Sequence, residues 1–129
     1  MPVILYVALG GALGAVARYG ISGWVHTVAG TLLPWGTLFV NVAGSFLLGF
    51  SIRYLEFTTV TPELRAALTV GFLGAFTTFS TYSYETVALL QEGAWARAAT
   101  YALGSLITGI LFVLAGFAVA QLLSPARGP

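Results

Sequence analysis

The scarcity of charged residues is the feature that most restricts what this chain can fold into. Of its 129 residues, five are Lys or Arg and four are Asp or Glu, so 7% are charged. Soluble domains average about 25%. The stretches 19–52, 66–84 and 98–126 contain no Asp, Glu, Lys or Arg. A soluble fold of this size needs a polar surface, which so few charges cannot supply. The sequence therefore predicts an all-α integral membrane protein.

The same composition excludes several classes of protein. A net charge of +1 offers no electrostatic surface for nucleic acid, so we expect no nucleic-acid partner. The absence of Cys excludes disulfides, thiolate metal sites and Cys nucleophiles, and the single His26 cannot form a His-rich metal site. No Ser/His, His/Glu or paired-Asp arrangement is available, so we expect no enzyme activity.

Four apolar segments are long enough to cross a lipid bilayer as helices, at about 3–25, 37–55, 63–90 and 95–123. The breaks HTVAGTLLPWG, EFTTVTP and QEGAW are rich in turn and helix-starting residues. Thr61 is the expected N-cap of the third span, with Pro62 in its first turn. The first span has no preceding basic region and is not read as a signal peptide. We expect residues 1–129 to form a single multi-pass domain in the cell membrane.

Four spans would place both ends of the chain on one side of the membrane. Arg53, Arg65 and Arg127 fall on that side and Arg97 and Arg18 on the other, which is a weak orientation signal. Two interpretations stay open: other features fix the orientation, or copies insert both ways and pair antiparallel. The sequence shows no internal repeat, so any two-fold axis that transport needs would come from a second copy.

Small residues four apart occur on two spans. They are Gly10 and Gly14 on the first span and Ser105 and Gly109 on the fourth. Such spacing allows membrane helices to approach closely, so we expect helix–helix contacts there.

The third span contains the most unusual stretch of the chain, GFLGAFTTFSTYSYE at 71–85. Adjacent Thr residues, hydroxyls that bond the backbone and two Gly all disfavour an uninterrupted helix. We predict a break near 74–78, buried in protein or lining water, because lipid cannot satisfy free backbone groups. Carbonyls freed in this way bind desolvated cations in other broken helices. The alternative is a continuous helix whose hydroxyls donate to carbonyls four residues back.

Polar and aromatic side chains form stripes on three spans. Asn41 interrupts an otherwise apolar second span and offers two donors and one acceptor. The helical repeat groups the other members as Phe79 with Tyr82, Ser80 with Ser83, and Tyr101 with Ser105 and Thr108. Donors and ring edges favour a small anion, as do Arg18 and the Asn41 amide, because cation pathways favour rings of Asp or Glu. The alternative is that these stripes are only helix–helix contacts.

Three blocks of the sequence resemble, in order, the signature blocks of the Fluc (CrcB) fluoride channels. They are GGALGAVARY (10–19), GTLFVNVAGSFLLG (36–49) and GFLGAFTTFSTYSYE (71–85), and the length and four-span layout are similar too. The resemblance implies a passive fluoride-selective channel that lets fluoride leave the cell. It also implies an antiparallel dual-topology homodimer with two pores at its interface. A structural sodium ion would lie between the two broken third helices.

The resemblance further implies roles for individual residues. Gly74 and Thr77 match positions whose backbone carbonyls hold the sodium ion, and Asn41 matches a pore-lining asparagine. Phe79 matches the first of two aromatics whose ring edges contact fluoride, and Tyr82 stands where the second is usually Phe. The polar track is expected at Ser80, Thr81, Ser83, Tyr101 and Ser105. Charges of the pore vestibule are expected at Arg18 and Glu85.

The sequence departs from the family pattern at two positions. The extra hydroxyl of Tyr82 could add a donor or crowd the path, and Gly109 stands where some members have Ser. Two functions other than a channel also stay open. A proton-coupled exporter would need a titratable carboxylate, for which Glu85 is the only deep candidate. In a subunit with a purely structural role, Asn41 and Phe79 would affect only stability.

Overall fold

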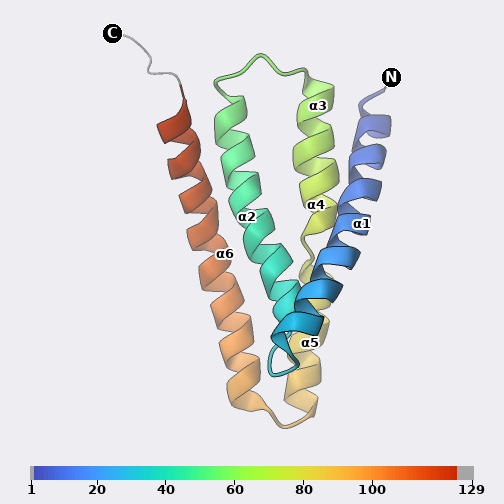
Figure 1. Ribbon diagram of the computed structural model, residues 1–129, viewed down its shortest axis with the longest axis vertical. Coiled ribbons are helices and arrows are strands. Elements are labelled where there is room, and N and C mark those ends of the chain that lie inside the picture. Colours follow the sequence, from blue (N-terminus) through green and yellow to red (C-terminus); the bar gives the residue numbers. More distant parts are fainter. Residues whose placement is uncertain (1, 125–129) are drawn as a thin grey trace.

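The computed structural model describes residues 2–124, whose helices form a bundle of membrane-length segments (Figure 1). Helix α1 spans Val3–Ala29, α2 spans Trp35–Leu55 and α6 spans Trp95–Leu123. Each of these three is long and apolar enough to cross a membrane. The remaining segment, the third along the chain, is divided into α3 (Pro62–Ala66), the π-helix η1 (Ala67–Phe72), α4 (Leu73–Phe76) and α5 (Phe79–Gln91). We call it the third segment.

The helix ends agree closely with the sequence-based expectation. The first span continues a turn beyond its predicted end, to Ala29, where Gly30 takes a φ of 87°, a conformation that glycine tolerates. Thr61 is the N-cap of α3, as predicted. Its hydroxyl accepts a hydrogen bond from the Leu64 N–H at 3.3 Å, and Pro62 occupies the first turn.

The start of α1 and the end of α6 lie at the same end of the bundle, as an even number of crossings requires (Figure 1). The α2–α3 connection lies at that end too, close to Arg53 and Arg65 in the sequence. Arg127, which we assigned to the same side, lies outside the described residues.

Glycine brings α1 into direct contact with the backbone of the third segment. A Cβ atom on Gly10 would collide with the carbonyl of Ala67, and one on Gly14 would collide with the carbonyl of Phe72. The predicted close contact at this glycine pair is therefore confirmed, and the π-helix is the element that it contacts.

Helices α2 and α6 form a second close pair. A Cβ atom on Gly49 or Gly116 would collide with the backbone of the facing helix. On the predicted pair, Ser105 and Gly109, a Cβ added at Gly109 would lie 3.7 Å from the Ser45 Oγ, which is ordinary contact. The expected helix–helix contact is therefore present at Gly109, and the two helices come closest two turns further along α6, at Gly116.

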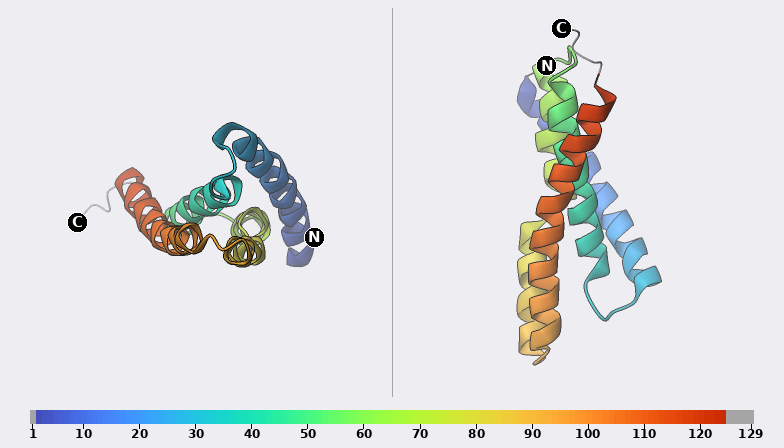
Figure 2. Two further views of the ribbon diagram at one scale, coloured as in Figure 1. Left: turned by 90° about the horizontal axis from the view of Figure 1, so that it is seen from below. Right: turned by 90° about the vertical axis from the view of Figure 1, so that its left-hand side faces the viewer.

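Much of the apolar surface is left uncovered by the chain itself. In the most apolar stretch of α1, and likewise of α6, 11% of the residues are buried. One small cluster of buried side chains, Leu89, Ala98 and Tyr101, lies between α5 and α6. Lipid or a second protein surface must cover the rest. At one end the α1–α2 turn and the α5–α6 turn lie apart, so the bundle opens there (Figure 2).

Candidate functional site

The third segment leaves the helical conformation at Thr77 and Thr78, within the predicted range of 74–78. Thr77 has φ −90° and ψ 157°, and Thr78 has φ −149° and ψ 117°, so both are extended. The Thr78 hydroxyl then caps α5 by accepting from the Thr81 N–H at 3.2 Å. The alternative of a continuous helix is therefore wrong.

Asn41 on α2 satisfies the backbone at this break. Its side-chain Nδ2 donates to the Thr78 carbonyl at 3.0 Å, and its Oδ1 accepts from the Thr78 N–H at 2.7 Å. A residue that has left a helix inside a membrane protein needs such partners, because buried backbone groups are almost always paired. The amide therefore makes the interhelical hydrogen bond that the sequence allowed as one of its roles.

Because of the break, the carbonyls of Gly74 and Thr77 do not receive the hydrogen bonds that a continuous helix would give them. In a continuous helix the Thr78 N–H would bond the Gly74 carbonyl, and the Thr81 N–H would bond the Thr77 carbonyl. The Thr78 N–H instead donates to Asn41, and the Thr81 N–H donates to the Thr78 hydroxyl. Gly74 is exposed on the surface of the chain, and Thr77 is half-buried. The two carbonyls expected to bind a cation thus lose their helical donors.

A groove of about 570 Å³ begins at the break and continues between α2, α5 and α6. We call it the central groove, and its polar and aromatic lining includes Asn41, Ser45, Phe79, Tyr82 and Ser105. The Ser45 hydroxyl donates to the Asn41 carbonyl at 2.7 Å. The Ser105 Oγ is buried and has no hydrogen-bond partner within residues 2–124. Ser105 therefore brings an unused donor to this groove.

Three aromatic rings follow one another from the open face of the central groove into the protein. Phe79 is 79% exposed, and its ring centroid lies 5.7 Å from that of Tyr82. The Tyr82 ring lies 5.4 Å from the ring of Tyr101, which is buried in the core. The expected pair Phe79 and Tyr82 is thus brought together at one wall.

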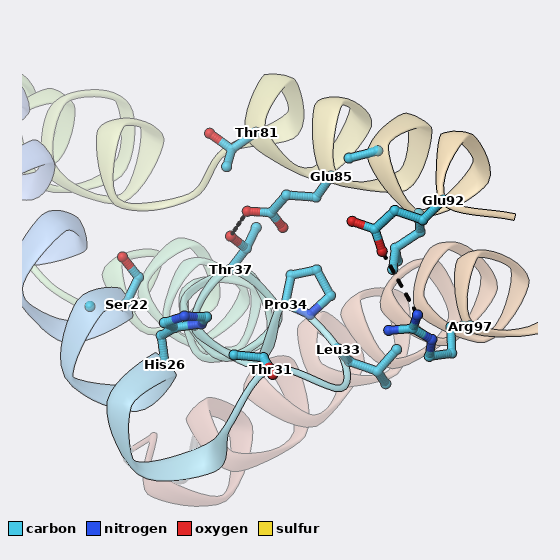
Figure 3. Close-up of a pocket in the computed structure, with 14 residues that line it drawn as sticks. Ser22, His26, Thr31, Leu33, Pro34, Thr37, Thr81, Glu85, Glu92 and Arg97 are labelled. Atoms are coloured by element: carbon cyan, nitrogen blue, oxygen red, sulfur yellow. Dashed lines mark hydrogen bonds and ion pairs between the residues drawn. The ribbon is translucent and has the colours of Figure 1, made fainter. Parts of the chain in front are cut away.

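A second cavity, of about 450 Å³, opens where the two turns separate (Figure 3). We call it the end cavity. Its lining includes Ser22 and His26 from α1, Thr37 from α2, and Glu85 from α5. A smaller cavity of about 230 Å³ is lined by Arg18 and shares Ser22, Thr37 and Thr81 with the end cavity. The two charges expected at a vestibule, Arg18 and Glu85, therefore line neighbouring cavities.

Glu85 is held by two hydroxyl groups from other helices. The Thr37 hydroxyl donates to Glu85 Oε1 at 2.7 Å, and the Tyr101 hydroxyl donates to Oε2 at 2.7 Å. Within residues 2–124, Glu85 has no ion-pair partner, whereas Glu92 Oε2 lies 3.8 Å from Arg97 Nη2 at one end of the same cavity (Figure 3). The carboxyl group thus links α5 to both α2 and α6.

The other predicted polar residues are spread over different surroundings. Thr81 lines the end cavity. Ser80 is exposed, with its hydroxyl 3.4 Å from that of Thr78. The Ser83 hydroxyl donates to the Phe79 carbonyl of its own helix at 2.9 Å. In the single chain these residues do not form one continuous track with Ser105.

Sequence reasoning missed Thr37 and Thr78 as parts of this region. Thr78 belongs to the predicted break, but its double pairing with Asn41 has no signature in the sequence. Thr37 precedes Asn41 by four residues, so the two share one face of α2. That spacing was the available signal for Thr37.

Replacing Tyr101 by Phe removes one of the two donors to Glu85. Hydrogen bonds of this kind contribute about 1–3 kcal/mol, so we expect Tyr101→Phe to lower the free energy of unfolding by that amount. Tyr84→Phe is the matched control, because Tyr84 lies on the same helix as Glu85 and is 75% exposed. Reversible unfolding in detergent, followed by circular dichroism, measures both variants. Equal losses in the two would contradict the role of the Tyr101 hydroxyl.

Comparison with known proteins gives consistent matches over nearly the whole chain. Residues 5–117 match the family model described as CrcB-like protein, Camphor Resistance (CrcB). A protein of Thermus thermophilus named fluoride-specific ion channel FluC is 51% identical over 113 residues, covering 88% of this chain and 89% of that relative. Relatives of the same name come from Hahella chejuensis, 51% identical over 95% of this chain and 98% of the relative, and Geotalea daltonii, 43% identical over 94% and 98%.

Proposed function

This chain belongs to the CrcB-like protein family, and from that premise we propose that it forms a fluoride-selective channel through which fluoride leaves the cell passively. It is a multi-pass protein of the cell membrane and not an enzyme. The observation that carries the proposal is the 51% identity to relatives named fluoride-specific ion channels, over as much as 95% of this chain. The range that matches the family model, residues 5–117, spans the residues of the helix break, Asn41 and the central groove.

The chemistry of the central groove supports an anion. Its lining combines aromatic rings, an amide and hydroxyl groups, and it contains no Asp or Glu among the described residues. The unused donor of Ser105 and the ring edges of Phe79 and Tyr82 suit a small anion that must lose water to enter. The positive charge of Arg18, which lines the smaller cavity, would attract anions from solution.

We place the pathway between two copies of the chain, arranged antiparallel. The central groove is open to the outside of the single chain, and both Phe79 and Gly74 are exposed beside the break. A second copy inserted in the opposite direction would cover this surface through a two-fold axis in the membrane plane. Such a homodimer would have two equivalent pores at its interface, with lipid around the remaining apolar surface.

The residues at the break also fit a structural sodium ion. The carbonyls of Gly74 and Thr77 have lost their helical donors, and two antiparallel copies would bring four such groups to the two-fold axis. Carbonyl oxygens are the ligands that sodium takes at broken membrane helices. Bound there, sodium would supply the positive charge that these oxygens need at an interface from which water is excluded.

Removing sodium is therefore expected to weaken the dimer or to stop fluoride flux. Four convergent carbonyls without a donor or cation would be costly at a dry interface. Flux from liposomes and the oligomeric state in detergent are compared in sodium and in N-methyl-D-glucamine buffers. Full flux together with unchanged dimerisation in the sodium-free buffer would contradict the sodium site.

The proposal of passive flux is tested against a proton-coupled exporter. Liposomes containing the purified protein and potassium fluoride receive valinomycin, with the pH equal on both sides and no protonophore, and fluoride release and proton uptake are followed together. A channel releases fluoride without coupled proton movement. Fluoride release accompanied by proton uptake in a fixed ratio would overturn the channel in favour of the exporter, with Glu85 as the candidate carboxylate.

A further inference from the structure

Tyr82 carries a hydroxyl at a position where the family resemblance leads us to expect Phe. The hydroxyl donates a hydrogen bond of 2.7 Å to the backbone carbonyl of Ala102 on α6. The Tyr82 ring itself lines the central groove, between the rings of Phe79 and Tyr101. The ring and the hydroxyl of this residue therefore have different surroundings, one in the groove and one on the neighbouring helix.

We propose that Tyr82 is a positioning residue of the ion pathway. Its hydroxyl links α5 to α6 and thereby fixes the ring at the wall of the central groove, and the hydroxyl is not a ligand of the ion. This inference rests on the proposed function, because it assigns a role within the same groove. The sequence left two possibilities open for the extra hydroxyl: that it adds a donor to the pathway, or that it crowds the pathway. The proposed role differs from both, because the hydroxyl points to α6 and not to the ion.

The position of α5 explains why such a link matters. α5 has 13 residues and begins after the break, so no continuous helix connects it rigidly to α4. Two hydrogen bonds cross between α5 and α6 in opposite directions: Tyr82 donates to the Ala102 carbonyl, and Tyr101 donates to Glu85. Helix α5 is thus hydrogen-bonded to α6 at two points less than a helical turn apart in α5.

The donors of the central groove support the same assignment. The Ser45 hydroxyl donates to the Asn41 carbonyl, and the Tyr82 hydroxyl donates to the Ala102 carbonyl. The Ser105 hydroxyl is the buried one that has no partner within residues 2–124. An ion in the groove would therefore find a hydroxyl donor at Ser105 without breaking an existing bond, whereas using Tyr82 would leave the Ala102 link broken.

The test compares Tyr82→Phe with the wild type and with Tyr84→Phe, a control on the exposed face of the same helix. We expect Tyr82→Phe to lower the midpoint of thermal unfolding by about 2–5 °C, through the loss of one hydrogen bond. We also expect fluoride flux from liposomes to fall by about threefold, because the ring is no longer fixed. Tyr84→Phe should change neither quantity.

A spectroscopic measurement separates a link from an ion ligand. Protein labelled with ¹³C at the tyrosine Cζ atoms is titrated with sodium fluoride, and the Tyr82 signal is identified by its absence in Tyr82→Phe. We expect this signal to stay constant, since its hydroxyl remains bonded to Ala102. A shift that follows the fluoride concentration would overturn the inference.

Two further results would also overturn it. An unchanged unfolding midpoint in Tyr82→Phe would mean that the hydroxyl does not link the helices. A lowered midpoint with undiminished flux would mean that the link does not position the ring. If the wild-type protein carries no fluoride, the proposed function fails, but the midpoint still decides whether the Tyr82–Ala102 bond stabilises the protein.

Discussion

Gly14→Ala should prevent the chain from folding stably, whereas Gly23→Ala should leave it intact. Both positions lie in α1, and at both the change raises helix propensity by about 1 kcal/mol. A Cβ atom at Gly23 would meet nothing within 4 Å, whereas one at Gly14 would collide with the backbone carbonyl of Phe72. The pair therefore separates helix propensity from packing.

The size of this effect follows from what the added methyl group would displace. Overpacking of side chains costs about 1–3 kcal/mol, because rotamers can adjust. A backbone carbonyl cannot adjust in this way, so α1 would have to move away from the third segment, and we expect a loss of more than about 3 kcal/mol. Yield after detergent extraction, size-exclusion profile and unfolding midpoint measure the two variants side by side. Similar behaviour of both would contradict the close contact between α1 and the third segment.

Asn41→Ala should lower both stability and flux. The change leaves the N–H and the carbonyl of Thr78 without partners inside the membrane protein. Unsatisfied buried groups cost about 1–3 kcal/mol each, so for these two groups we expect a loss of about 2–6 kcal/mol in the free energy of unfolding. The break would also lose its fixed geometry, and we expect fluoride flux to fall by at least about tenfold.

Thr108→Val is the control for Asn41→Ala. The Thr108 hydroxyl donates to the Gly104 carbonyl within its own helix at 2.6 Å. Loss of this hydroxyl leaves no backbone group without a hydrogen-bond partner. We expect Thr108→Val to change the free energy of unfolding by less than about 0.5 kcal/mol. Equal losses in the two variants would show that the Asn41 pairing does not stabilise the break. Loss of stability in Asn41→Ala with undiminished flux would favour a purely structural role.

The positions of the spans and of the break follow from local features of the sequence. Charged residues are rare enough that their spacing marks the membrane segments. Adjacent Thr77 and Thr78 disfavour a helix wherever they stand in a fold, and the chain does leave the helix there. The cap at Thr61 is equally local, because it depends on a hydroxyl at the residue before the helix.

The features that the sequence did not predict all depend on contacts between distant segments. The π-helix Ala67–Phe72 has no propensity signal, and it lies where the glycines of α1 meet the third segment. An amide in an apolar helix predicts a hydrogen bond, but not that Asn41 pairs with both backbone groups of Thr78. The direction of the Tyr82 hydroxyl likewise depends on where α6 lies.

The central claim, that this chain conducts fluoride selectively, is tested most directly by ion efflux from liposomes that contain the purified protein. The liposomes are loaded with potassium fluoride or potassium chloride, valinomycin is added, and each anion is followed with a selective electrode. We predict rapid release of fluoride with little release of chloride. Release of neither anion by folded, dimeric protein, or equal release of both, would contradict the claim.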